Sequence, residues 1–298
     1  MAIYRRSGLL LSAAYSLDGS PVSKAYDVNG ELVFDGTVVD YSNFTTSAFC
    51  SASVSNMQGF DIYGVTIFQF RGQGTTIKDK MLTIATENGR IIGNNITAKS
   101  DHGDSASFSS VKYEPADAFP LLYVTADTNP CKVYVNRVTA TSSQLIRTLL
   151  FPLDKAGYYG AHAYDESRQI MYIVGYTEEN YQTDDGGNNK TRVSLWDMSD
   201  LTDNGDNTFT PRFISNYDRP FIYTMQGQQF HDGLIWIASG GTGTSQYIYA
   251  LDPEDGTQCF KIDLETTTEV EGLAFISPTE MVVGFQGGTY TKYTFATV

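Results

Sequence analysis

Positive charge is scarce in this chain of 298 residues, which has 20 lysines and arginines against 34 aspartates and glutamates and a formal net charge of −14. A nucleic-acid-binding protein would need a basic surface, so we expect no nucleic-acid partner. Long apolar runs are also missing. None reaches the roughly 18 residues of a membrane-spanning helix, and we therefore expect no membrane insertion.

Cysteine is rare as well. The three cysteines, Cys50, Cys131 and Cys259, show neither a short pairing distance nor the spacing of metal ligands. This pattern predicts three free thiols in a chain that folds in a reducing compartment. The apolar stretch around Leu9–Leu11 superficially resembles a signal peptide, but it is short and a turn-rich repeat follows it directly, so we expect no cleaved leader.

Motifs for catalysis or metal binding are missing too. The sequence has no Gly-x-Ser-x-Gly nucleophile elbow. The three histidines, His102, His162 and His231, fall in different repeats without ligand-like spacing. The segment 200–206 resembles a calcium loop, but its twelfth position is Pro211, where a bidentate glutamate is needed. We therefore predict no catalytic residue, no metal and no cofactor.

Glycine and tyrosine, by contrast, are plentiful, with 27 and 20 residues. Five segments share one layout: a polar or aromatic residue, a glycine, a short strand, a tight turn and a strongly apolar strand. Two further strand-like runs follow the apolar strand in the first four segments, and Asn88-Gly89 is a typical hairpin turn between two of them. Each unit is thus a four-stranded meander of about 45 residues, which is the sequence signature of a β-propeller blade. The five glycines are Gly59, Gly103, Gly160, Gly227 and Gly272.

The fifth repeat is one strand short, because the chain ends soon after the run Tyr290–Phe295. A spare strand-like run, Phe44–Ser51, precedes the first repeat. A ring has to close its last blade or leave an unpaired edge. The sequence therefore predicts an all-β fold in which residues 41–298 form a five-bladed β-propeller and the N-terminal strand completes the last blade. The alternative is an irregular β-sandwich or two separate sheets.

The first 40 residues have a different organisation. Two similar stretches, Ala14–Val22 and Ala25–Val33, each consist of a short apolar run, an Asp-Gly or Asn-Gly turn and an apolar return. Two such small β-hairpins bury little surface by themselves, so residues 1–40 are predicted to be a docking segment. Its apolar candidates for docking are Ile3, Tyr4, Leu10, Tyr15, Tyr26, Val28 and Phe34.

Two motifs in this segment, Ile3-Tyr4-Arg5-Arg6 and Ala25-Tyr26-Asp27-Val28-Asn29-Gly30-Glu31, resemble the starts of virion appendage proteins (tail or head fibres) from gut bacteriophages and prophages. The resemblance is confined to the first ~35 residues. It implies a fibre protein that is assembled in the host cytoplasm, is located in the virion as part of an oligomeric assembly, and contacts other virion proteins through residues 1–36. It also implies that the distal domain binds a host surface glycan or protein.

The residues that precede the five glycines form the main candidate site. In a propeller they would lie at the same end of the innermost strands and ring the mouth of the central channel. They would either bind a polar ligand or simply form hydrogen bonds between neighbouring blades. This candidate ring consists of Gln58, His102, Tyr159, Gln226 and Glu271.

An acidic insertion between Gly175 and Phe209 is the second candidate. Long loops on rigid scaffolds often carry binding residues, although a solvated, mobile hairpin tip would have the same composition. Nearby aromatic residues could stack on sugars or pack within strands; they are Tyr176, Tyr181 and Trp196. The candidate contact residues are Asp184, Asp185, Asn188 and Asn189.

These features favour a non-enzymatic structural protein of a phage virion. One alternative is a propeller glycoside hydrolase or lyase of a gut bacterium, for which Asp61, Asp104 and Glu271 could supply a pair of carboxylates about 5–10 Å apart. Asp165 and Asp232 fall at the opposite end of the inner strands and are interpreted as turn formers. A third possibility is a structural adaptor in a larger assembly that has no ligand of its own.

Overall fold

The computed structural model describes residues 39–73, 77–126 and 128–297, together with four short strands nearer the N-terminus. Apart from the one-turn helix α1 (Leu153–Ala156) and the 3-10 turn η1 (Asp185–Gly187), its regular elements are strands. No helix in this described part is long and apolar enough to cross a membrane.

Most strands belong to antiparallel meanders of four, in which each strand pairs with the next along the chain. The first meander consists of β6 (Met57–Tyr63), β7 (Thr66–Gln73), β8 (Ile77–Ala85) and β9 (Ile91–Thr97). The second consists of β10 (Ser105–Phe108), β11 (Leu122–Ala126), β12 (Cys131–Val138) and β13 (Ser143–Phe151). The third consists of β14 (Tyr158–Asp165), β15 (Ile170–Tyr176), β16 (Thr191–Asp203) and β17 (Thr208–Arg219). The fourth consists of β18 (Met225–His231), β19 (Leu234–Ser239), β20 (Tyr247–Leu251) and β21 (Gln258–Asp263).

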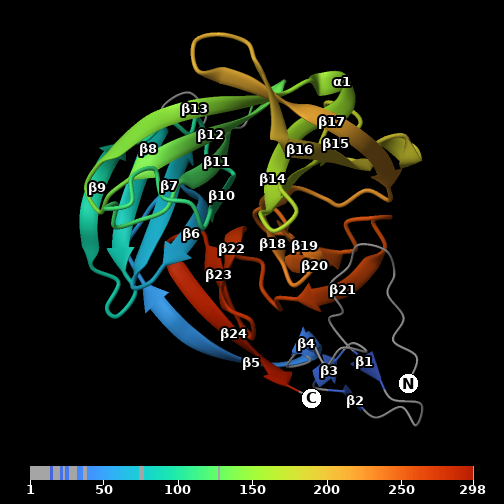
Figure 1. The fold of residues 1–298 in the computed structure, drawn as a ribbon. Helices are drawn as coiled ribbons and strands as arrows, with labels where there is room; N and C mark the ends of the chain where they lie inside the picture. The colour runs from blue at the N-terminus through green and yellow to red at the C-terminus, as the bar shows by residue number, and fades with distance from the viewer. Residues whose placement is uncertain are drawn as a thin grey trace.

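The second and third meanders are joined into one eight-stranded sheet. Their outer strands β13 and β17 run parallel and pair through Thr148 with Thr208 and through Leu149 with Phe209. Figure 1 shows why these strands meet: the long β16–β17 hairpin extends across the outer edge of the neighbouring meander. The sequence did not predict this junction.

The last sheet is built from both ends of the propeller segment. It contains β22 (Val270–Ser277), β23 (Glu280–Phe285) and β24 (Thr289–Thr297), and its outer strand is β5 (Val39–Ser51). Tyr290 lies opposite Cys50, and Phe295 lies opposite Phe44. The predicted pairing of the N-terminal strand with the last repeat is therefore confirmed.

The sheets are arranged around a common centre, with the first strand of each meander innermost (Figure 1). Strand β6 contacts β10 and β22, β14 contacts β10 and β18, and β18 contacts β22. Apolar side chains fill the space between neighbouring sheets. Phe68 and Phe70 of β7, for example, share a buried cluster with Leu122 and Val124 of β11. Because each sheet is covered on both faces, its second strand is apolar on both sides, which explains the strongly apolar runs in the sequence.

Glycine is required where the inner strands approach one another. A Cβ atom added at Gly227 would lie 2.7 Å from the Cα atom of Gly272, and one added at Gly59 would lie 2.7 Å from the carbonyl oxygen of Asp104. Real Cβ atoms do not tolerate such distances from backbone, so a side chain at either position would push the strands apart. Three of the five repeated glycines thus narrow the centre of the ring.

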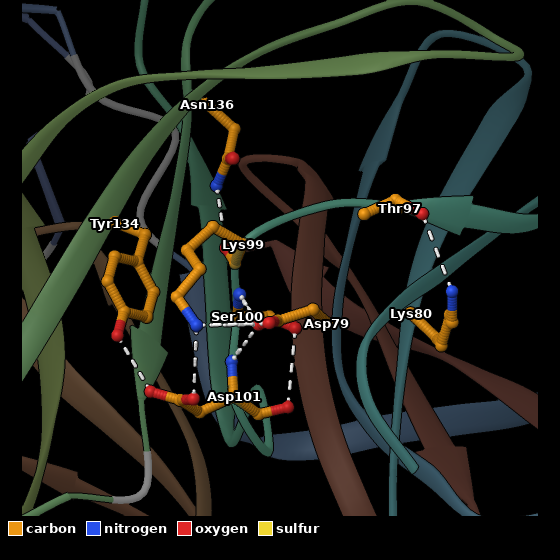
Figure 2. A network of polar contacts seen from close by, with 8 residues as sticks. All are labelled: Asp79, Lys80, Thr97, Lys99, Ser100, Asp101, Tyr134 and Asn136. Atoms are coloured by element: carbon orange, nitrogen blue, oxygen red, sulfur yellow. Dashed lines mark hydrogen bonds and ion pairs between the residues drawn. The ribbon is translucent and has the colours of Figure 1, made fainter.

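Polar contacts tie neighbouring sheets together nearer the rim. Figure 2 shows one such network, in which Lys99 Nζ donates to Asp79 Oδ2 at 3.0 Å and to Asp101 Oδ1 at 3.2 Å. From β12, the Tyr134 hydroxyl donates to Asp101 Oδ2 at 2.7 Å and Asn136 Nδ2 donates to the Lys99 carbonyl at 3.0 Å. The end of the first meander is thereby fastened to the second.

The two hairpins predicted in the docking segment are confirmed at the level of strand pairing. Strand β1 (Ala14–Tyr15) pairs with β2 (Pro21–Val22), and β3 (Lys24–Tyr26) pairs with β4 (Leu32–Asp35), in both cases antiparallel. The docking role itself stays a prediction. Ile3, Tyr4, Leu10 and Val28 lie outside the described residues, as do the side chains of Tyr15, Tyr26 and Phe34.

Candidate functional site

A cavity of about 410 Å³ opens where the innermost strands begin. Its wall contains four of the five residues of the candidate ring, each from a different meander: Gln58, His102, Tyr159 and Gln226. Gln58, Tyr159 and Gln226 lie near the start of the first strands β6, β14 and β18, and His102 lies in the turn just before β10. The structure thus brings together residues that lie up to 168 positions apart in the sequence (226 − 58).

Four tyrosines, one of them the ring residue Tyr159, line the cavity. They are Tyr159, Tyr176, Tyr181 and Tyr223. The ring of Tyr181 meets that of Tyr159 edge to face, with centroids 5.0 Å apart, and lies 6.1 Å from that of Tyr176. Tyr181 belongs to the loop between β15 and β16, which is the first part of the acidic insertion. The ring and the insertion, which the sequence presented as separate candidates, therefore form one site.

The loop owes its shape to Asn189. Asn189 is buried, its Nδ2 donates to the carbonyls of Asn180 at 2.6 Å and Thr183 at 3.0 Å, and its Oδ1 accepts the backbone N–H of Glu178 at 3.2 Å. Asn189 was predicted as a contact residue of an exposed insertion. The structure corrects that assignment, since the side chain is used inside the loop.

The other residues of the insertion divide between surface and core. Asp184 and Asn188 are exposed, and Asp184 Oδ1 accepts the backbone N–H of Gly186 at 3.2 Å. The side chain of Asp185 lies outside the described residues. Trp196 is fully buried, with its ring 5.2 Å from that of Phe151, so it packs the core and is not placed to stack on a sugar.

The cavity is lined by carboxylates, and none of its described lining residues is a lysine or an arginine. Asp104 Oδ1 lies 2.7 Å from His102 Nδ1. Glu269 Oε1 accepts a hydrogen bond from Gln226 Nε2 at 2.8 Å, and Glu269 Oε2 accepts one from the Thr242 hydroxyl at 2.5 Å. Sequence reasoning missed Glu269, although its position two residues before Glu271 places it on the same side of an extended chain.

Glu271, the fifth residue of the candidate ring, does not line the cavity. It is only 1% exposed, and neither carboxylate oxygen has a hydrogen-bond partner among the described residues. Burial raises the pKa of Glu271 well above its ordinary value, and the negative charges of Glu269 and Asp104 raise it further. Its assignment as a contact residue at the channel mouth is therefore corrected, because its side chain is buried inside the protein.

Asp61 braces the centre of the ring. Its Oδ1 accepts hydrogen bonds from Ile62 N at 2.8 Å and Gln229 Nε2 at 3.0 Å, and its Oδ2 accepts one from Phe108 N at 2.6 Å. Gln229 Oε1 in turn accepts the N–H of Phe275. Burial raises the pKa of Asp61 to about 6, although the three donors oppose the shift. Of the three acids considered for glycoside hydrolysis, only Asp104 faces the cavity.

The three histidines have separate roles. His162 is fully buried, with Nδ1 2.6 Å from the Thr125 hydroxyl and Nε2 2.7 Å from the Ser107 hydroxyl, and it links β14 to β10 and β11. His231 lies at the β18–β19 turn, with its ring stacked 3.7 Å from that of Phe275. Only His102 reaches the cavity. No group of three or more potential metal ligands occurs among the described side chains.

The remaining sequence candidates lie away from the cavity. Asp165 Oδ1 accepts the Ser167 hydroxyl at 2.6 Å in the β14–β15 turn, and Asp232 has a positive φ of 49° in the β18–β19 turn. Both fit the interpretation as turn formers. Asp200 lies 3.0 Å from Arg212 Nε in the β16–β17 hairpin. The three cysteines are free, and Cys131 is buried.

Protonation of His162 is expected to couple stability to pH. Burial lowers its pKa from 6.5 to about 3. Between these values the unfolded chain binds a proton that the native chain does not, so the stability contributed by His162 is complete above pH 6.5 and is lost as the pH falls towards 3. Urea unfolding between pH 4 and 6 measures the free energy of unfolding of the wild type and of His162→Gln. This free energy should fall more steeply with decreasing pH in the wild type, by about 1.4 kcal/mol per pH unit. Parallel curves would contradict this assignment.

No family model matches the chain, and neither does any curated protein. Among solved structures, it is similar to the glutaminyl cyclase of Myxococcus xanthus, with a TM-score of 0.54 and 11% identity over 86% of this chain and 98% of that chain. The PQQ-bound aldose sugar dehydrogenase of Streptomyces coelicolor gives a TM-score of 0.48 and 8% identity over 85% and 98% of the two chains. A Bacteroides thetaiotaomicron protein of unknown function gives a TM-score of 0.47 and 13% identity over 85% of this chain and 76% of that chain. The similarity to the cyclase is one of fold alone, and it shows that the chain has a β-propeller-like architecture.

Proposed function

We propose that this protein is a non-enzymatic binding component of a phage virion, a fibre or appendage protein whose propeller holds a host surface glycan or protein at the cavity described above. The cavity itself is the main support. It has the size of a small-ligand site, it combines aromatic walls with a few polar groups, and it is formed where the inner strands begin and by the connections next to them. The virion location and the host cytoplasm as the place of assembly rest on the N-terminal resemblance.

The propeller in this proposal has five blades. The eight-stranded sheet counts as two of them, because only two residue pairs join β13 to β17, whereas each meander has its own inner strand. The five inner strands also contact one another in a closed order, β6, β10, β14, β18, β22 and back to β6. On this count, the docking segment covers residues 1–40 and the propeller the rest of the chain.

Binding is favoured over hydrolysis by the state of the carboxylates. Asp61 is buried and accepts three hydrogen bonds, and Glu271 is buried away from the cavity surface. Asp104 and Glu269 face the cavity, but both already hold side-chain partners. A glycosidase needs one acid and one base or nucleophile that can both touch the sugar bond, and this geometry is better suited to holding a ligand.

Adsorption of the purified protein to host cells tests the proposal. His102→Ala and Tyr181→Ala should reduce adsorption at least about tenfold, the loss typical of an aromatic or polar contact at the centre of a binding site, while the melting temperature stays nearly unchanged. Tyr113→Ala is the matched control, since Tyr113 is 47% exposed and does not line the cavity.

Equal adsorption of the two variants and the wild type would refute a binding role for the cavity. Release of reducing ends from host polysaccharide by the wild type, lost in Asp104→Asn or Glu269→Gln, would instead establish the hydrolase.

A further inference from the structure

We infer that the chemical group bound in the cavity is an organic ammonium cation, such as a protonated amine or a quaternary ammonium group. The inference deepens the proposed function, on which its biological meaning rests. It starts from charge. Two carboxylates, Asp104 and Glu269, line the cavity, and its described lining contains no lysine or arginine to balance them. The imidazole of His102, bound to Asp104, is the one lining side chain that can become positive.

Behind this wall lies the buried carboxyl group of Glu271. Both of its oxygens are buried without a hydrogen-bond partner among the described residues, an arrangement that costs free energy unless something else at the site compensates for it. The backbone of Asp104 comes close to the residue after Glu271, since a Cβ atom added at Gly227 would lie 3.6 Å from the Asp104 carbonyl oxygen and 2.7 Å from the Gly272 Cα atom. A cation in the cavity would offset the repulsion between the Asp104 and Glu269 carboxylates and would favour the ionised form of Glu271 behind them.

The tyrosines decide what kind of cation fits. Tyr159, Tyr176, Tyr181 and Tyr223 make up the aromatic wall. The electron-rich face of an aromatic ring attracts an alkylammonium ion, whose methyl or methylene groups also bury apolar surface against it. A small hydrated metal ion would gain little from such a wall, and a neutral sugar would leave the carboxylates unbalanced. Aromatic rings combined with carboxylates therefore select an organic cation.

Tyr159 and Tyr176 belong to strands, and Tyr223 lies in the connection between β17 and β18. Tyr181 comes from the insertion, where it is held by a loop whose path depends on the side chain of Asn189. It is the best position for a test, because removing its ring leaves the strands and the carboxylates in place.

The experiment measures the affinity of the full chain for choline and for 3,3-dimethyl-1-butanol, which has the same shape without the charge. Calorimetry or ligand-observed NMR should show choline binding at least about tenfold more tightly than the neutral compound. Tyr181→Ala and Glu269→Gln should each weaken choline binding about tenfold, whereas Tyr181→Phe, which keeps the ring, and the distant control Tyr113→Ala should change it less than about twofold.

Equal binding of the charged and neutral compounds, or no binding of either, would overturn the inference. So would choline binding that survives both Tyr181→Ala and Glu269→Gln. The outcome is separable from that of the proposed function. If the cavity variants lose host-cell adsorption but the wild type does not prefer choline, the cavity binds the host through another group. If choline is preferred but adsorption is unaffected by the same variants, the ammonium site stands and the receptor role fails.

Discussion

Deletion of residues 44–51 is expected to unfold the entire propeller, although the deleted segment lies outside all five repeats. It supplies the outer strand of the last sheet, where Phe44 packs 5.4 Å from Tyr293 and Cys50 lies opposite Tyr290. Without it, β24 becomes an open edge and the buried clusters of the last sheet are exposed. The deleted strand contributes three partly buried side chains, Phe44, Phe49 and Cys50, and its loss uncovers buried residues of β24 such as Tyr290 and Tyr293. Loss of a single large core side chain costs about 3–5 kcal/mol, so these combined losses are comparable to the whole stability of a domain.

Tyr41, near the start of the same strand β5, shows a second contact of that strand. Tyr41 is buried, its ring lies 4.8 Å from that of Trp236, and its hydroxyl donates to Asp232 Oδ2 at 3.0 Å. Strand β5 therefore fastens the last sheet to the fourth meander as well as completing it. Far-UV circular dichroism and thermal melting of the deletion variant should show no cooperative transition at the wild-type temperature.

A circular permutant tests whether the ring needs strand β5 to pair with β24, whatever the order of the strands along the chain. Val39 lies opposite Thr297, so a short Asn-Gly turn can join the two residues, with the new chain starting at Ala52 and ending at Ser51. This permutant should melt within a few degrees of a chain that lacks only residues 1–36. A deletion variant that melts at the wild-type temperature, or a permutant that does not fold, would show that β5 does not close the ring.

The sequence was sufficient for the strands and their closure because those signals are local and repeated. The apolar second strands and the glycines near the start of the inner strands each recur at a fixed place in a unit, and Asn88-Gly89 is a local hairpin signal. The missing strand followed from counting, since Tyr290–Phe295 lacks an outer neighbour and Phe44–Ser51 lacks an inner one. None of these inferences needed the path of a long loop.

The site could be predicted only where it follows the repeat. Four members of the candidate ring converge, because the same position in equivalent strands points to the same place. Tyr181 was not assigned to that place, because the path of its loop is set by the amide of Asn189 and by contacts with rings from other elements. The burial of Glu271 was also missed, because the close approach of the inner strands at Gly227 and Gly272 depends on the assembled ring.

The acids show how burial changes the meaning of a residue type. Asp61, Asp104 and Glu271 are equivalent candidates in the sequence, yet one accepts three hydrogen bonds, one faces the cavity and one has no partner among the described residues. Pattern alone does not reveal which carboxylate is solvated. Of these three acids only Asp104 lines the cavity, where the second carboxylate is Glu269.

Under the proposed function, removal of residues 1–36 is expected to leave the propeller folded but to abolish its incorporation into the virion. The residues of the ring and its closing strand all follow position 36, so the truncated chain keeps every element that the propeller needs. The removed segment contains four acidic and three basic residues, so charge does not account for it, and its distinctive feature is a dense set of apolar side chains on two short hairpins. Leaving that surface in water would cost roughly 25 cal/mol per Å² of apolar area. In the proposed virion, burial against another protein would remove this cost and anchor the propeller.

Complementation with tagged chains measures the effect. Particles purified from cells that supply the truncated chain should lack it by immunoblot, whereas full-length Tyr181→Ala, altered only at the cavity, should be incorporated at the wild-type level. The purified truncated chain should melt within a few degrees of the full-length protein, which excludes misfolding as the cause of its absence. Wild-type incorporation of the truncated chain would contradict the anchoring role. Unfolding of the truncated chain would show instead that the segment packs on its own propeller, because only an intramolecular contact can make the ring depend on residues 1–36 in isolation.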